Sequence, residues 1–114
     1  MKNVLVANLN PKNKRYKTDK LLTLLKAQVE NSIDLGWNKE DIWIVANFKF
    51  EYMGVKSFVA DLNKFCWTGS KMFGLKWLAD NNMFEDTLWL KDADLWQNTP
   101  FACPDFEDVG ACHY

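Results

Sequence analysis

The residues with the clearest chemical potential are two aspartates, Asp92 and Asp94, which follow the apolar stretch at 88–90. Carboxylates are costly inside a core unless they are paired or bind a cation. On an extended chain, side chains two apart point to the same side, so both carboxylates can reach one small region. A hard divalent cation would relieve their repulsion and bridge them to phosphates. The spacing predicts a Mg²⁺ or Mn²⁺ site for a phosphorylated ligand. The alternative is that both aspartates cap a turn or a helix.

Apolar runs along the chain predict the strands that would position these aspartates. Strands rich in β-branched and aromatic residues are expected at 3–9, 41–48 and 88–90, with a shorter one at 58–62. The segment before that short strand, 49–57, reads as a loop around Gly54.

Two amphipathic segments predict helices. Thr18 or Asp19 is expected to cap the first helix, which stops at Gly36. Ser70 is expected to cap the second, which ends at Asn81-Asn82. The positions expected to face the core are Leu22, Leu25, Val29 and Ile33 in the first helix, and Met72, Leu75 and Leu78 or Ala79 in the second.

The order of these elements predicts an α/β fold of one domain over residues 1–114, with a largely parallel sheet flanked by helices. In open sheets of this kind, ligands bind at the carboxyl ends of the strands. Asp92 and Asp94 are expected at such an end. A sheet with one side uncovered would also offer a surface for a second chain, so oligomerisation is left open.

Composition excludes several classes of function. Net charge is -1 and the basic residues are scattered, which argues against nucleic acid as a partner. No apolar run approaches the roughly 20 residues that a membrane helix needs. Three cysteines at irregular spacing argue against a disulfide framework, and Cys103, Cys112 and His113 match no zinc pattern. A cytoplasmic protein is expected.

The stretch LWLKDADLWQ resembles the Asp-x-Asp motif of GT-A-type glycosyltransferases, which are nucleotide-sugar enzymes with a Rossmann-like sheet. Two motifs, NFKFEYMGV at 47–55 and DADLWQ at 92–97, are also similar to a bacterial and viral group of glycosyltransferase-like proteins. The similarity extends from Asn3 to about Phe101 through these motifs and the element order.

This resemblance implies a function and a set of site residues. Asp92 and Asp94 would coordinate Mn²⁺ or Mg²⁺, which bridges the donor diphosphate and stabilises the leaving nucleoside diphosphate. A nucleotide pocket would lie at the carboxyl ends of the first two strands, at Asn8, Asn10 and Asn47. The implied partners are a nucleoside diphosphate sugar and an acceptor, glycan or protein, that the sequence does not identify.

The chain departs from the GT-A pattern in two places. Lys91 precedes Asp92 where most GT-A enzymes have an apolar residue, and a lysine there can pair with an acid, contact a phosphate or compete with the metal. Only 20 residues follow Asp94 in a chain of 114. The acceptor half and its general base are therefore expected in a longer protein of which this chain is a fragment, and the catalytic residues are unknown.

Three further residues are candidates for ligand contacts. Lys71, near the start of the second helix, is expected either to contact a phosphate or to be a solvated surface residue. Asp61 is expected to contact the nucleotide base or to form a turn. Trp96 is the tryptophan considered for a ligand. Most of the four in or beside predicted elements, Trp37, Trp43, Trp77 and Trp89, are expected in the core.

Two other functions compete with the glycosyltransferase. A non-catalytic nucleotide-binding module or an inactive remnant would suit the short carboxyl terminus. A phosphotransferase of the haloacid-dehalogenase type also uses Asp-x-Asp, but places it after the first strand and usually follows it with Thr or Val.

Overall fold

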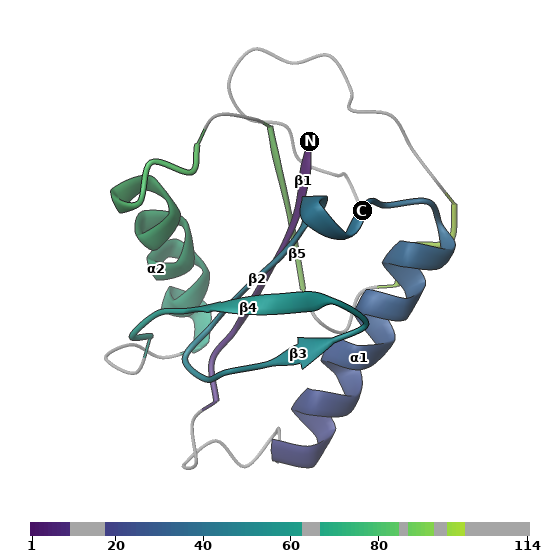
Figure 1. Cartoon of the computed structure of the whole chain (residues 1–114). Helices are drawn as coiled ribbons and strands as arrows, with labels where there is room; N and C mark the ends of the chain where they lie inside the picture. Colours follow the sequence, from purple (N-terminus) through teal and green to yellow (C-terminus); the bar gives the residue numbers. More distant parts are fainter. Residues whose placement is uncertain (10–17, 63–66, 85–86, 93–95, 100–114) are drawn as a thin grey trace.

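The structure is a computed structural model that describes residues 1–9, 18–62, 67–84, 87–92 and 96–99. It is a mixed α/β fold with a mostly parallel five-stranded sheet and two α-helices in the described part (Figure 1). In chain order the elements are β1 (Lys2–Ala7), α1 (Thr18–Asp34), the 3-10 turn η1 (Lys39–Asp41), β2 (Ile42–Ala46), β3 (Glu51–Tyr52), β4 (Val55–Val59), α2 (Trp67–Asp80) and β5 (Leu88–Lys91).

The strand order is β3-β4-β2-β1-β5. β1 pairs in parallel with both β2 and β5, and β2 pairs in parallel with β4, whereas β3 is antiparallel to β4. The chain therefore moves outward from β1 through β2 and β4, and then returns to the other side of β1. In open α/β sheets, ligands bind outside the carboxyl ends of the strands where the order reverses in this way. Here that point lies between β1 and β5.

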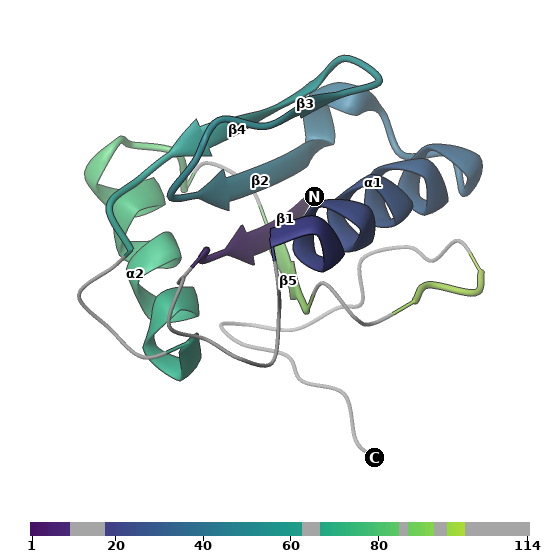
Figure 2. The same ribbon diagram turned by 90° about the horizontal axis from the view of Figure 1, so that it is seen from below.

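The two helices cover opposite faces of the sheet (Figures 1 and 2). Leu5 of β1 packs with Leu25 of α1, while its neighbour Val4 packs with Leu78 of α2. Successive residues of a strand point to opposite faces, so a strand buried on both faces must be apolar at consecutive positions. This explains the continuous apolar runs in β1 and β2. Within the described chain, neither helix is long and apolar enough to cross a bilayer.

The structure confirms strands where the three clearest apolar runs predicted them, although β1 and β2 are shorter than expected. The prediction for the remaining strand was wrong in position: β4 lies at Val55–Val59, and the expected loop contains β3 and a hairpin. Met53 and Gly54 form the turn with φ values of 51° and 83°. Two residues at positive φ suit a tight hairpin, but methionine rarely adopts this conformation, so the sequence signal was weak.

The helix α1 begins at Thr18, one of the two residues predicted to cap its start, and Gly36, at φ 93°, follows its end. The helix α2 begins at Trp67, three residues before Ser70, the residue predicted to cap it. The expectation that Met72 faces the core was wrong, because its side chain is 65% exposed. Leu78 is buried and Leu75 packs partly against the core, as predicted, whereas the alternative Ala79 is exposed. Gly74 is buried although it was not predicted to face the core. The helix approaches the sheet through a glycine, which hydrophobic spacing does not detect.

Gly74 allows close contact between α2 and β1, and Gly74→Ala tests it. A Cβ at this position would lie 2.6 Å from Cγ2 of Val6. Valine is stiff at χ1 and Val6 belongs to a central strand, so the helix has to move outward. The helix-propensity gain of about 1 kcal/mol offsets part of this cost. We expect urea denaturation to show a net loss of about 1–2 kcal/mol in the free energy of unfolding. A variant more stable than the wild type would contradict the contact.

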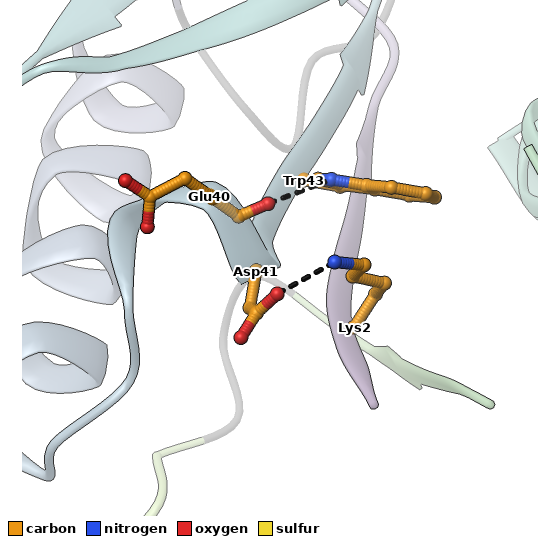
Figure 3. A network of polar contacts seen from close by, with 4 residues as sticks. All are labelled: Lys2, Glu40, Asp41 and Trp43. Carbon is orange, nitrogen blue, oxygen red and sulfur yellow. Dashed lines mark hydrogen bonds and ion pairs between the residues drawn. The ribbon is translucent and has the colours of Figure 1, made fainter. Parts of the chain in front are cut away.

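Charged residues at the amino-terminal edge of the sheet have a structural role (Figure 3). Nζ of Lys2 donates a hydrogen bond to Oδ1 of Asp41 over 2.6 Å and lies 5.4 Å from the ring centroid of Trp43. Nε1 of Trp43 donates to the carbonyl oxygen of Glu40 over 3.0 Å. These contacts tie the start of β1 to η1 and β2, at the edge opposite the carboxyl ends of the strands.

Candidate functional site at the carboxyl ends of the strands

The candidate site is built on an ion pair between Lys71 of α2 and Asp92, the residue that directly follows β5. Lys91 lies opposite Leu5 in the β1–β5 register, so the next residue, Asp92, comes at the level of Val6. Lys71 precedes Gly74 by one helical turn, on the face of α2 that meets Val6. The close approach of the helix thus brings Lys71 over the strand ends. The Lys71–Asp92 pair lies where the strand order reverses.

The Lys71–Asp92 pair is open to solvent, with side chains 39% and 45% exposed. Ion pairs with this exposure contribute only about 0–1 kcal/mol, so a ligand can replace either partner at small cost. Asp94 lies outside the described residues, which contain no group of three or more metal-ligating side chains. Magnesium commonly takes one or two carboxylates together with phosphate oxygens and water. The carboxylate of Asp92 is exposed and its ion pair with Lys71 is weak, so it is available as one such ligand.

Lys91 lies on the opposite face of the sheet from the Lys71–Asp92 pair. It follows Trp89 by two residues on β5, and Nζ of Lys91 is 5.1 Å from a ring centroid of Trp89. Trp89 stacks on Trp37, which follows α1, with ring centroids 5.8 Å apart. Lys91 is 3% exposed and its ammonium makes no hydrogen bond to any described residue. Burial lowers the pKa of Lys91 to about 8. The cation beside Asp92 is therefore Lys71, which the sequence did not pair with it.

Two of the predicted nucleotide-binding residues, Asn8 and Asn47, cross-link the strand ends. Nδ2 of Asn47 donates to Oδ1 of Asn8 and to the carbonyl oxygen of Leu9, both over 2.9 Å. Oδ1 of Asn47 accepts from the Leu9 backbone N–H over 2.8 Å, and Nδ2 of Asn8 donates to the carbonyl oxygen of Leu62 over 3.1 Å. These bonds join the ends of β1 and β2 to the segment after β4. A nucleotide contact by these side chains stays a prediction, and Asn10 lies outside the described residues.

Asp61 follows β4 at the same edge of the sheet and is exposed. In the strand order, β2 and β1 separate β4 from β5, so Asp61 and Asp92 are about 14 Å apart at the usual strand spacing. The edge therefore presents Asp61, Asn47, Asn8 and Asp92 in that spatial order. One extended nucleotide would contact Asp61 through its base and the region of Asp92 through its diphosphate. Both contacts stay predictions.

Gln97 anchors the segment after β5 to α1, a role that sequence reasoning missed. Its backbone N–H donates to Oδ1 of Asn31 over 3.2 Å, and Nδ2 of Asn31 donates to the carbonyl oxygen of Gln97 over 3.0 Å. Nε1 of Trp37 donates to Oε1 of Gln97 over 3.0 Å. These bonds fix the described segment 96–99 to α1 and to the residue Trp37 that follows it. The glutamine of the DADLWQ run was the signal, but its partner 66 residues away was not predictable. Trp96 is 58% exposed and accessible to a ligand.

Comparison of the chain with protein-family models, with curated proteins and with solved structures gave no match. The class that the structure itself defines is a mixed α/β protein with a mostly parallel sheet.

Proposed function

We propose that this chain is the donor-binding part of a metal-dependent glycosyltransferase with a Rossmann-like sheet. The observation that carries the proposal is the position of Asp92. An aspartate directly follows β5, where the strand order reverses, and it has a cationic side chain as its partner. Ligands of open α/β sheets bind at this position. The carboxylate-rich DADLWQ run supplies the hard oxygen ligands that magnesium and manganese prefer.

Each part of the carboxyl edge has a role in the proposal. Asp92 and Asp94 would hold Mg²⁺ or Mn²⁺, whose charge stabilises a departing nucleoside diphosphate. Lys71 would contact the diphosphate, and Asp61 would contact the base.

Asn8 and Asn47 keep the ends of β1 and β2 together beneath the place proposed for the nucleotide. The hydrogen bonds between Gln97 and Asn31 of α1 would anchor the end of the DADLWQ run.

The test is calorimetric titration of the folded chain with UDP and GDP, first with Mn²⁺ and then with EDTA. We expect one nucleotide to bind in a manganese-dependent way, and Asp92→Asn to weaken that binding about tenfold, because a neutral amide loses the charge-assisted contact to the metal. Asp80→Asn is the matched control, since Asp80 is also an exposed, ion-paired aspartate but lies at the end of α2. Binding that survives EDTA, or the absence of any binding, would overturn the proposal.

A further inference from the structure

The Lys71–Asp92 pair has properties of an interaction that opens when a ligand arrives. Both side chains are more than one-third exposed, so solvent screens the attraction and separation costs little. Lysine carries its charge on a flexible four-carbon stem, which allows the ammonium to reach a new partner without movement of the helix. The backbone of α2 is meanwhile held against Val6 by the close contact at Gly74. The backbone that carries Lys71 is therefore fixed, whereas its ammonium group can move.

Asp92 has two prospective cationic partners under the proposed function, Lys71 and a divalent metal. Both compete for the same carboxylate. Lys91 does not take part, because it is buried on the other face of the sheet. A metal that arrives alone has to displace the ammonium and leaves Lys71 without a partner. A metal that arrives with a diphosphate brings phosphate oxygens that accept hydrogen bonds from that ammonium.

We propose that Lys71 exchanges partners, from Asp92 in the ligand-free protein to a phosphate oxygen when a divalent metal and a nucleoside diphosphate bind together. This inference rests on the proposed function and adds its regulation. The exchange makes the metal and the nucleoside diphosphate bind cooperatively. The metal neutralises the Asp92 carboxylate that Lys71 leaves, and the phosphate accepts a hydrogen bond from the Lys71 ammonium that the metal displaces. Free metal is disfavoured, and Asp92 is committed to metal only when the donor is present. A nucleoside without phosphates would gain nothing from Lys71.

The exchange predicts effects of opposite sign for Lys71→Met. Manganese alone should bind about threefold more tightly, because the competing ammonium is gone. In saturating manganese, UDP should bind about tenfold more weakly, because a charge-assisted hydrogen bond to phosphate is lost. Electron paramagnetic resonance of free Mn²⁺ measures the first quantity, and calorimetry measures the second. A residue that only supports the fold would weaken both or neither.

Lys76→Met is the matched control, since Lys76 lies on the same helix and forms an exposed ion pair with Asp80. It should leave both affinities unchanged, and circular dichroism should show that both variants are folded. Manganese binding that is unchanged or weaker in Lys71→Met, while the wild type still binds manganese and UDP, would overturn the exchange and leave the proposed function intact. A wild type that binds no UDP with manganese would overturn both.

Discussion

Replacement of Lys91 with methionine should stabilise the fold by about 2 kcal/mol at pH 7. Lys91 is 3% exposed and its ammonium makes no hydrogen bond to the described residues. A buried charge without a partner loses its hydration, which is why the pKa is lowered from 10.5 to about 8. A shift of this size corresponds to about 3 kcal/mol, and loss of the contact with Trp89 takes back up to about 1 kcal/mol. Methionine keeps a similar length and packs without desolvating a charge.

The gain from Lys91→Met should depend on pH in a defined window. Between about pH 8 and pH 10.5 the unfolded chain holds a proton on Lys91 that the folded chain has lost. The wild type therefore becomes more stable as pH rises through this window, whereas the variant lacks this contribution. The difference in the free energy of unfolding between Lys91→Met and the wild type should have its largest value below about pH 8 and should disappear near pH 10.5.

Urea denaturation at pH 7, 9 and 10.5 in EDTA measures this difference. Lys76→Met is the control, because Lys76 is exposed and its replacement should change stability by no more than about 0.5 kcal/mol. A difference between wild type and Lys91→Met that is constant with pH would show that the ammonium is not desolvated in the folded chain.

Replacement of Asn47 with alanine should destabilise the fold by about 3 kcal/mol. The Asn47 amide makes hydrogen bonds with the Leu9 N–H, the Leu9 carbonyl and the Asn8 side chain. Each such bond contributes about 1 kcal/mol, and alanine leaves the Leu9 backbone groups without these partners. The ends of β1 and β2 then lose their cross-link, so the carboxyl edge of the sheet should loosen.

Chemical denaturation measures the loss, and Asn81→Ala is the matched control. Nδ2 of Asn81 donates to the carbonyl oxygen of Trp77 at the exposed end of α2, so its removal should cost under about 1 kcal/mol. A loss in Asn47→Ala as small as in the control would argue that the amide network does not support the sheet, and would leave Asn47 available for a nucleotide.

The site was predictable in part. Its position in the sheet follows from the order of the elements, but the side chains that pair with each other there do not. An apolar strand that runs into Asp92 late in an α/β pattern pointed to the carboxyl edge, and the structure has Asp92 directly after β5. The sequence did not pair Lys71 with Asp92, since that pairing needs the turn of α2 that lies over β1. The anchor at Gln97 was missed for the same reason.

Local patterns were sufficient for the elements whose burial is periodic. β1, β2, β5 and α1 follow from runs and stripes of apolar residues, because each residue's burial there depends on the pitch of its own element. The hairpin at Met53 and the close contact at Gly74 do not follow from the pitch of their own elements. Positive φ at a methionine and close approach of a helix are set by neighbouring elements.

Tertiary structure decided which charges and amides meet. The order β4-β2-β1-β5 brings the ends of β1 and β5 together, and register then puts Asp92 on the face of α2 and Lys91 on the face of α1. Two adjacent residues thus acquire opposite environments, a solvent-exposed ion pair for Asp92 and, for Lys91, a buried ammonium with no hydrogen bond to the described part of the chain. The alternation of side chains along a strand makes the two faces distinct, but only packing of the helices determines what each face contains.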